Sequence, residues 1–558
     1  MNSFKSKATR IAVIVVVVIS SIFYSFKSSN EFKILKSLDI FYSIFRELMF
    51  FYVDDIDPEK AIDAGIEGLL SSLDPYTSYV PAEEKKNFRF LTTGEYGGIG
   101  AYVRRNDTAV IISEPHKNFP ADKAGLRAGD IILEIDDKPV KQTDLRDVSE
   151  MLKGIPSTTV KIKICRPFID SVFSVSIARE KISIKSVSYY NLVRGTVGYI
   201  RLERFTQDAS KEVKEAFVYL RDKRGATSVI LDLRGNPGGL LNEAVDIVNL
   251  FVKKNTLIVE TRGKVEKYNA SYKTTMEAVD TLIPLVILVN GSSASASEII
   301  AGTMQDLDRA VVVGEKTYGK GLVQSTRSLS YEAQLKVTTA RYYIPSGRCI
   351  QAIDYSDKAA KKITATDTAK RKFTTRNGRL VYDAGGIMPD VVVESEEMAR
   401  ITYKLFNEQH IFDFSTYFRV HNDTIAKPSL FTLREEDYAD FKSFLEKRGF
   451  SYRTASEEKL ESLIETIKEE KYFERTEATL QELKKKLEHD KNNDLDQHKD
   501  MIMQLLREEI VSRYYYNEGR LAVALTADPQ IERAIEVLTD KETYAGILSG
   551  KKKYGNII

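Results

Sequence analysis

The spacing of apolar residues changes several times along the chain, and each change predicts a different kind of structure. Between residues 31 and 73, apolar side chains recur every three or four positions, which predicts amphipathic helices. Residues 94–178 instead contain short β-like runs separated by Gly, Asp and Asn. Residues 193–349 alternate apolar strands with helical patterns, and from residue 395 onward the pattern is helical and highly charged. We therefore expect helical regions at both ends, a small β-rich domain and an α/β core.

Two apolar runs define the predicted α/β core. Residues 227–233 and 285–289 read as buried strands, because both are short and largely apolar. A Gly-rich turn follows the first run and leads into a predicted helix at 240–252. A segment of small residues follows the second run and leads into a helix that ends near Gln305. This repeated order of strand, turn and helix is typical of an α/β fold.

Composition and charge exclude several classes of protein. The length of 558 residues is too great for one ordinary core and predicts two to four domains. The net charge is only +2, which does not favour nucleic-acid binding. Two cysteines, Cys165 and Cys349, exclude a disulfide-rich scaffold and a zinc cluster built on cysteines. The histidines form no HExxH pattern, which excludes a zincin-type metalloprotease.

The pattern of the N-terminus predicts an export signal. Residues 11–26 form an apolar run that follows three basic residues and no acidic one, which directs insertion with the basic side in the cytoplasm. The run is shorter than the roughly 20 residues of a full span. It therefore fits a cleaved signal peptide too, but bulky residues stand where a cleavage site needs small ones. We favour an uncleaved anchor over a signal peptide, with a buried soluble helix as the third alternative. Both favoured alternatives predict a periplasmic protein of the bacterial envelope, anchored in the inner membrane or secreted.

Two segments together indicate a peptide-binding domain. A Gly-rich turn at residues 96–103 leads into a strand, so that successive N–H groups can meet one carboxylate and the strand edge can pair with an extended peptide. Residues 120–135 then read PADKAGLRAGDIILEI. In combination these segments resemble the PDZ domain over about residues 89–179. The resemblance implies that a polypeptide C-terminus is bound by backbone N–H groups near Gly98, Ile99 and Gly100. The alternative is that these residues only shape the turn.

A serine and a lysine are the candidate catalytic groups. Residues 290–298 read NGSSASASE, and their small side chains permit a sharp strand-to-helix junction that presents one serine beside unpaired helical N–H groups. No histidine lies between His116 and His410 to act as the base. A neutral lysine can replace histidine in that role. Residues 314–324, GEKTYGKGLVQ, provide Lys316 and Lys320.

Four segments in order resemble the C-terminal processing peptidases, a family of serine–lysine enzymes also called tail-specific proteases. They are residues 198–205 (GYIRLERF), 230–239 (ILDLRGNPGG), 289–302 and 314–324. The likeness continues through 73–81 and 385–392 and covers roughly residues 35–395. It implies a crotonase-like (ClpP-like) α/β protease core with an inserted PDZ domain and no metal or nucleotide.

The same resemblance implies roles for individual residues. Ser295 matches the nucleophile, Lys320 the general base and Gln324 the residue that orients the lysine. The backbone N–H groups of Gly239 and Ala296 match the oxyanion donors. The residues alone leave Ser292, Ser293 and Ser297 open as alternatives to Ser295, although turn formation and capping are their ordinary roles. Lys316 likewise stays an alternative to Lys320, and Glu298 is expected to be a first-turn acid or helper.

The predicted domains are a signal anchor or signal peptide (1–28), an N-terminal helical region (29–88), the PDZ domain (89–180), the serine protease core (181–394) and a C-terminal helical extension (395–558). We expect a membrane-associated endopeptidase that cleaves near the C-terminal tails of envelope proteins, while its PDZ domain binds the tail and gates activity. The extension is a candidate for self-association or adaptor binding.

Two other functions are weaker hypotheses. A membrane-tethered PDZ adaptor with an inactive protease fold is disfavoured, because Ser295, Lys320 and Gln324 are all present. A crotonase-like acyl enzyme is disfavoured by the PDZ segments and the export signal.

Overall fold

The N-terminal part of the protein is helical. The computed structural model describes residues 30–84, 92–106, 109–169, 171–353, 355, 371–383, 385–491 and 493–551. The chain divides into two compact units, Met1–Tyr79 and Val80–Ile558. The first unit contains a helix at 30–51 and helix α2 (Pro58–Ser71), which begins after the N-cap residue Asp57. The predicted anchor at residues 11–26 lies outside the described residues, and none of the described helices is long and apolar enough to span a membrane.

The β-rich domain is an antiparallel sheet in the order β3-β4-β5-β7-β8, with β6 paired to β5. Alternate residues of β7, such as Ile162 and Ile164, are buried in its core, as the period of a strand requires. Strand β3 forms one edge of the sheet and contacts helix α5. The elements are β2 (Glu95–Gly98), β3 (Ala101–Arg105), β4 (Val110–Pro115), α4 (Pro120–Lys123), β5 (Ile131–Ile135), β6 (Lys138–Pro139), α5 (Leu145–Leu152), β7 (Thr159–Arg166), β8 (Ser171–Ala178) and β9 (Glu180–Ser183), the last paired with β2.

The α/β core is built on a six-stranded sheet in the order β10-β11-β12-β15-β16-β21. Strand β10 is antiparallel to β11, and the other neighbours are parallel. Every residue of β12 and β15 is buried, which explains the continuous apolar sequence of β15 and the apolar centre of β12. The strands are β10 (Val187–Val193), β11 (Val197–Leu202), β12 (Ser228–Asp232), β15 (Leu285–Val289), β16 (Val311–Gly314) and β21 (Val391–Val392).

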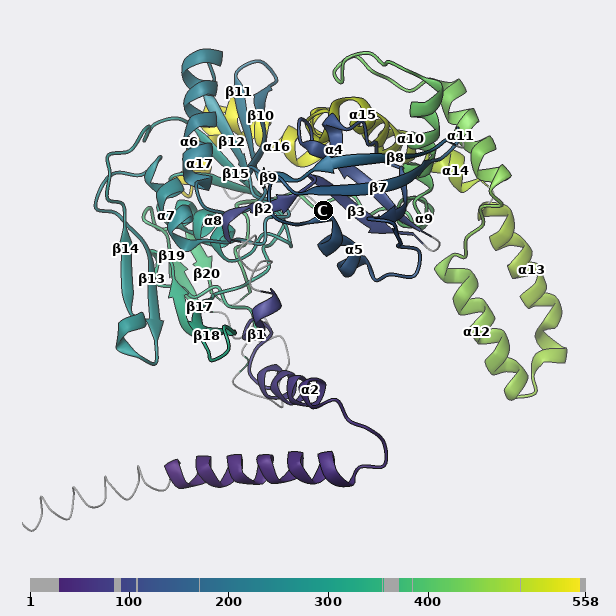
Figure 1. Ribbon diagram of the computed structural model, residues 1–558. Helices are drawn as coiled ribbons and strands as arrows, with labels where there is room; N and C mark the ends of the chain where they lie inside the picture. Colours follow the sequence, from purple (N-terminus) through teal and green to yellow (C-terminus); the bar gives the residue numbers. More distant parts are fainter. Residues whose placement is uncertain are drawn as a thin grey trace, which may run out of the picture. The chain divides into compact units, whose positions relative to one another are not determined.

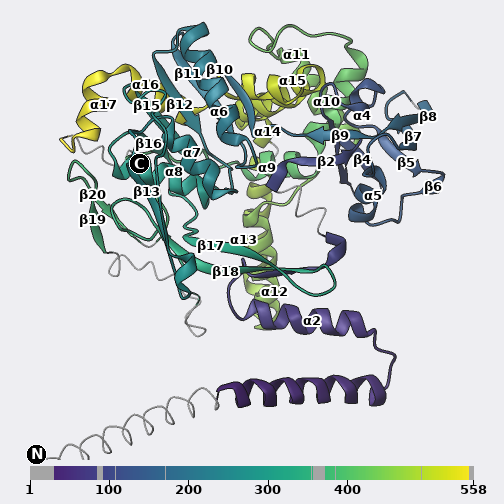
Figure 2. The same cartoon turned by 60° about the vertical axis from the view of Figure 1, so that its left-hand side comes forward.

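Helices cover both faces of this sheet (Figures 1 and 2). The helices on one face lie between the strands in the sequence, and those on the other face follow all the strands. Leu285, Ile287 and Val289 of β15 pack with α6 (Ala209–Val218), α7 (Leu241–Asn249) and α8 (Ala296–Asp306). The alternate residues Val286 and Leu288 pack with α16 (Pro529–Thr539) and α17 (Lys541–Leu548). One face of the core sheet is thus covered by the C-terminal end of the chain.

A second, antiparallel sheet lies in the protease region. In it, β18 pairs with β17 and with β13, and β13 also pairs with β14. A separate hairpin joins β19 to β20. The bounds are β1 (Ser78–Val80), β13 (Leu257–Gly263), β14 (Ala270–Lys273), β17 (Leu322–Ser328), β18 (Gln334–Tyr343), β19 (Lys372–Thr374) and β20 (Leu380–Tyr382).

The C-terminal region is helical, as its pattern predicts. Its core is rich in aromatic side chains, among them Phe414, Phe441 and Phe444, which pack with Leu506 and Ile510 of α15. The helices are α9 (Arg400–Asn407), α10 (His410–His421), α11 (Glu435–Lys447), α12 (Ala455–Glu469), α13 (Phe473–Lys491), α14 (Asp494–Gln497) and α15 (Lys499–Ala524). The predicted combination of an α/β core, an inserted β-rich domain and helical end regions is confirmed.

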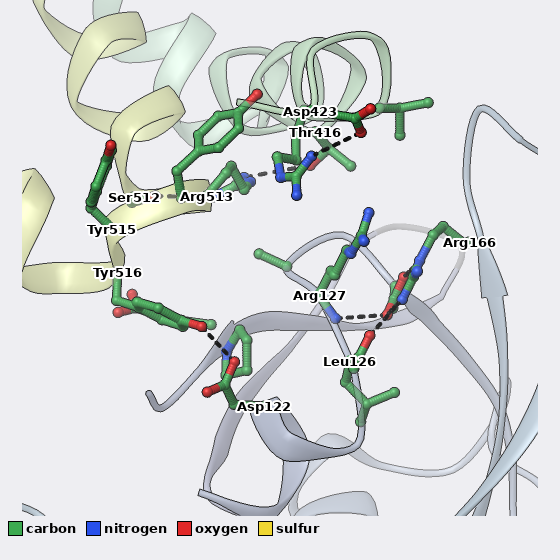
Figure 3. Close-up of a pocket in the computed structure, with 18 of the residues that line it drawn as sticks. Asp122, Leu126, Arg127, Arg166, Thr416, Asp423, Ser512, Arg513, Tyr515 and Tyr516 are labelled. Carbon is green, nitrogen blue, oxygen red and sulfur yellow. Dashed lines mark hydrogen bonds and ion pairs between the residues drawn. The ribbon is translucent and has the colours of Figure 1, made fainter. Parts of the chain in front are cut away.

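Helix α15 joins the helical region to the β-rich domain. It is kinked at Tyr516, whose φ is 57°. At the kink, the Tyr516 hydroxyl donates a 2.6 Å hydrogen bond to Asp122 of the β-rich domain (Figure 3). One turn later, Arg520 forms a 3.1 Å ion pair with Glu114. These contacts border a cavity of about 470 Å³ that is lined by Arg127, Arg166, Arg419 and Tyr515, among other residues.

Candidate active site

The turn between β15 and α8 presents Ser295. Its neighbours Ser293 and Ser297 are fully buried, and their hydroxyls donate to the carbonyl oxygens of Leu233 (2.8 Å) and Asn236 (3.0 Å). Ser295 is partly exposed and has φ 56° and ψ −112°. A positive φ is strained for a residue other than glycine and persists where the surroundings enforce it, often at functional turns. Within this segment, Ser295 therefore has a side chain that solvent can reach and a backbone held in a strained conformation.

Glu298 links Ser295 to the segment that contains Lys320. Its side chain is fully buried, and Oε2 accepts 2.9 Å hydrogen bonds from the backbone N–H groups of Ser295 and Lys320. Oε1 accepts from the N–H of Gly319 (2.8 Å) and from the hydroxyl of Thr317 (2.6 Å). Burial raises the pKa of Glu298 to about 7, although the four donors lower it and stabilise the carboxylate. One carboxyl group thus fixes two segments that are far apart in the sequence.

Tyr342 of β18 supports the same two residues. Its buried side chain places Oη 3.2 Å from the carbonyl oxygen of Ser295 and within hydrogen-bonding distance of that of Lys320. The single hydroxyl proton can serve one carbonyl at a time. No local motif pointed to Tyr342, because its role depends on the distant strand β18 lying beside the turn.

The predicted orienting residue Gln324 lies on β17 and is partly buried. Its Nε2 donates a 3.2 Å hydrogen bond to Thr338 Oγ1 on the neighbouring strand. The orienting role of Gln324 toward Lys320 stays a prediction. The alternative base, Lys316, is exposed, whereas Lys320 is partly buried.

The loop after β12 approaches the candidate nucleophile closely. A Cβ atom on Gly238 would lie 2.8 Å from the Ser295 Cβ and 3.0 Å from the amide nitrogen of Ala296. A Cβ atom on Gly239 would lie 2.3 Å from the carbonyl oxygen of Phe205, so this position excludes a side chain as well. Within the described part of the chain, no hydrogen bond uses the N–H of Gly239 or Ala296. Both amides are therefore available near Ser295, as donors to an oxyanion must be.

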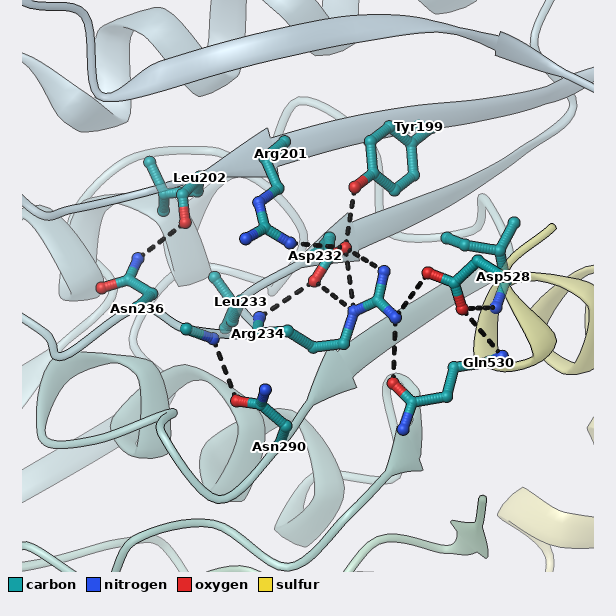
Figure 4. A network of polar contacts seen from close by, with 12 residues as sticks. Tyr199, Arg201, Leu202, Asp232, Leu233, Arg234, Asn236, Asn290, Asp528 and Gln530 are labelled. Carbon is teal, nitrogen blue, oxygen red and sulfur yellow. Dashed lines mark hydrogen bonds and ion pairs between the residues drawn. The ribbon is translucent and has the colours of Figure 1, made fainter. Parts of the chain in front are cut away.

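Side-chain amides hold this loop, which we call the oxyanion loop (residues 234–239), in place (Figure 4). Asn236 donates through Nδ2 to the carbonyl of Leu202 at 2.8 Å and accepts the N–H of Gly238 at 2.9 Å. Asn290, at the end of β15, accepts the N–H of Gly235 at 2.9 Å. The loop is thus connected both to β11 and to the turn that precedes Ser295.

Asp232, the last residue of β12, is a buried anchor for the start of the oxyanion loop. It accepts hydrogen bonds from the hydroxyl of Tyr199 (2.7 Å), from Arg201 Nη1 (3.1 Å) and from Arg234 Nη2 (2.6 Å). Burial alone would raise the pKa of Asp232, but the guanidinium groups of Arg234 and Arg201 outweigh burial and hold the pKa below its usual value. Asp232 is therefore ionised throughout the physiological pH range.

The β-rich domain has a groove along its edge strand. A cavity of about 940 Å³ lies between β3 and α5. The carbonyl groups of Ile99 and Gly100 accept from Ala121 and His116 at 2.8 Å, while no hydrogen bond in the described regions uses the N–H of Ile99 or Gly100. Gly98 ends β2 at the same turn. The apolar part of the lining includes Ile99, Val103, Leu145, Leu152 and Ile155.

Three known protein families match different parts of the chain. Residues 196–357 match peptidase family S41, residues 111–166 match the PDZ domain, and residues 401–538 match the C-terminal helical domain of a probable PDZ-protease. The chain is 37% identical over 332 residues to a carboxy-terminal-processing protease of Bartonella bacilliformis. The aligned residues make up 59% of this chain and 76% of that protein. The chain belongs to peptidase family S41.

A second curated relative and a solved structure are also similar to the S41 peptidase. A probable CtpA-like serine protease of Staphylococcus aureus is 33% identical over 404 residues, or 72% of this chain and 79% of that protein. The solved structure of a photosystem II D1 C-terminal processing protease is 28% identical and covers 62% of this chain and 86% of that chain, with a TM-score of 0.35. This S41 peptidase is a C-terminal processing serine protease with a PDZ domain, as its sequence predicts.

Proposed function

We propose that the S41 peptidase hydrolyses peptide bonds near the C-terminal tails of envelope proteins with Ser295 as nucleophile and Lys320 as general base. The observation that carries this proposal is the double hydrogen bond of Glu298 to the backbone amides of both residues. It keeps the strained serine turn and the lysine segment together, which is the pre-organisation that proton transfer requires.

The chemistry is that of acyl transfer. The neutral amine of Lys320 takes the hydroxyl proton of Ser295 while the serine oxygen bonds to the substrate carbonyl carbon. The resulting oxyanion accepts hydrogen bonds from the N–H groups of Gly239 and Ala296, each of which contributes about 3 kcal/mol by analogy with oxyanion donors in other serine proteases. The lysine ammonium then protonates the leaving amine as the C–N bond breaks. A water molecule, activated by the amine, attacks the acyl-enzyme and releases the shortened product.

The PDZ domain supplies substrate recognition in this proposal. An extended tail pairs with the free edge of β3, and its terminal carboxylate binds the N–H groups at Gly98, Ile99 and Gly100. Apolar side chains of the tail occupy the groove beside α5. The domain also gates activity, because it is attached to the helical region by Tyr516 and Arg520 and can respond to an occupied groove.

The proposed location is the bacterial envelope. Residues 11–26 anchor the enzyme in the inner membrane with its catalytic part in the periplasm, or direct its secretion if they are cleaved. Self-association or adaptor binding through the C-terminal helical region stays a hypothesis.

Two variants and one matched control test the proposed chemistry. Ser295→Ala and Lys320→Met should each lower hydrolysis of a tail peptide by at least about 10³-fold, because the nucleophile and base act as a unit. Lys316→Met, four residues from Lys320, should retain turnover. Mass spectrometry of intact envelope proteins should show untrimmed C-termini in cells that carry Ser295→Ala. Full turnover by a folded Lys320→Met enzyme contradicts the mechanism.

A further inference from the structure

We propose that Asp528 and Gln530 of the C-terminal helical region are positioning residues for the oxyanion loop. They contact Arg234, which begins that loop 296 residues earlier in the chain than Gln530. The inference rests on the proposed function, because it concerns the geometry of the oxyanion donors. It assigns part of the active-site framework to a segment outside the protease core predicted from the sequence.

The guanidinium group of Arg234 is held on two sides (Figure 4). On one side, its Nε and Nη2 atoms lie 3.0 and 2.6 Å from the Asp232 carboxylate. On the other side, Nη1 lies 2.7 Å from Asp528 Oδ2 and donates to Gln530 Oε1 at 2.9 Å. The Arg234 side chain is 13% exposed, so solvent screens these charge-assisted bonds weakly.

Asp528 and Gln530 are themselves fixed in place. Asp528 is the N-cap of α16 and accepts the N–H groups of Gln530 (2.9 Å) and Ile531 (3.1 Å). Gln530 is buried, and its Nε2 donates to the carbonyl of Val393, just after β21, at 2.8 Å. Helix α16 is anchored in turn by Ile531 and other apolar residues packed on the core sheet. The two side chains are therefore a rigid support for Arg234.

The geometry of the loop explains why this support affects catalysis. Arg234 is five residues before Gly239, and the N–H of the intervening Gly235 is fixed by Asn290 beside the serine turn. Asp232 holds one side of the guanidinium and Asp528 and Gln530 hold the other, so loss of either acceptor weakens the support of the loop start on that side. Donors to an oxyanion act over short distances, and a displacement of about 1 Å is enough to lower turnover by about 10²-fold.

Asp528→Asn separates this contact from helix capping. Asparagine is as good an N-cap as aspartate, so α16 keeps its start while Arg234 loses one of its two ionic partners and keeps Asp232. Asp540→Asn is the matched control, because Asp540 caps α17 by accepting the N–H of Thr543. Gln530→Leu removes the second acceptor, whereas Gln530→Glu keeps an acceptor for Arg234 and loses only the donor to the Val393 carbonyl.

We expect kcat to fall about tenfold in Asp528→Asn and in Gln530→Leu, while KM changes less than about twofold. Gln530→Glu should recover most of the loss. The affinity for a peptide boronic acid, which forms a tetrahedral adduct on the serine, should fall in parallel with kcat. Asp528→Asn should melt below Asp540→Asn, because it also loses the ion pair with Arg234, so kcat is compared at a temperature where both variants are folded.

Several results would overturn the positioning role. The role is refuted if Asp528→Asn and Gln530→Leu both turn over substrate within twofold of Asp540→Asn, while Ser295→Ala has lost all hydrolysis. Lower turnover with unchanged boronic acid affinity would show that the loss is not at the oxyanion donors. Hydrolysis that survives in Ser295→Ala instead refutes the proposed chemistry together with the inference built on it.

Discussion

The backbone N–H of Lys320 donates a 2.9 Å hydrogen bond to the buried carboxylate of Glu298, 22 residues earlier in the chain. Since Glu298 also accepts the N–H of Ser295, the lysine and serine segments cannot separate without exposing or orphaning a buried carboxyl group. The Glu298 carboxyl group therefore maintains the spacing between the segment of the candidate nucleophile and the segment of the candidate base.

Glu298 should make the stability of the protein depend on pH. Burial raises its pKa from 4.5 to about 7. Between these values the folded protein keeps a proton that the unfolded chain has lost, so the free energy of unfolding falls as the pH rises, by about 3 kcal/mol in total. Urea unfolding of wild type and Glu298→Gln from pH 4 to pH 8 measures the effect. The prediction is contradicted if the difference in free energy of unfolding between wild type and Glu298→Gln does not vary with pH.

Gly238→Ala should disrupt the oxyanion loop. Its φ is +98°, and the added Cβ would lie 2.8 Å from both the Ala294 carbonyl oxygen and the Ser295 Cβ. We expect a kcat reduced by about 10²-fold in peptide hydrolysis. Gly225→Ala is the control, because Gly225 has a similar φ of +75° but open space around its Cβ position. The Gly225→Ala variant should lose about 1–2 kcal/mol in its free energy of unfolding but little activity. Equal activity of the two variants would argue against close packing at Gly238.

Ile155→Ser should weaken tail binding without affecting chemistry. Ile155 lines the PDZ groove and is 75% exposed, so its replacement costs the folded protein little. Loss of its apolar contact with a bound tail should raise the dissociation constant of a C-terminal peptide about five- to tenfold. Fluorescence anisotropy with a labelled peptide measures this change. Val172→Ser, on the exposed outer strand β8, should bind like wild type. Unaltered affinity in Ile155→Ser would show that tails bind elsewhere.

Leu538→Ala should destabilise the protease core although it lies near the C-terminus. Leu538 is 6% exposed and packs on the core sheet with Ile230 and Val286. We expect a loss of about 2–5 kcal/mol in the free energy of unfolding. Leu463→Ala, on the exposed face of α12, should change stability by less than about 0.5 kcal/mol. Similar stabilities of the two variants would mean that α16 contributes little to the core.

The sequence predicted most closely the elements whose signals are local. The buried strand expected at 285–289 is found at those residues, because a continuous apolar run ends abruptly at Asn290. The helix expected at 240–252 is found as Leu241–Asn249. Within α15, Tyr516 has a non-helical φ of 57° and ψ of −162°, so it separates two helical segments that no pattern in the sequence analysis distinguished. The bounds of the five predicted domains stay predictions.

Relationships between distant residues could not be predicted. The amphipathic pattern of residues 529–539 does not say which sheet they cover, so their packing on β12 and β15 is visible only in three dimensions. The same holds for the contact of Tyr342 with the Ser295 carbonyl. The roles of Ser295, Lys320, Gln324, Gly239 and Ala296 came from resemblance to a family, and the geometry now gives each a local environment in which those roles can be tested.

The placement of α16 and α17 has a consequence for biosynthesis. All six strands of the core sheet precede α16 and α17 in the chain, so they are synthesised before the helices that shield one face of the sheet. Until then, the valines and isoleucines of that face are open to solvent and to chaperones. The full protease core can therefore assemble only after residues 529–548 have been made.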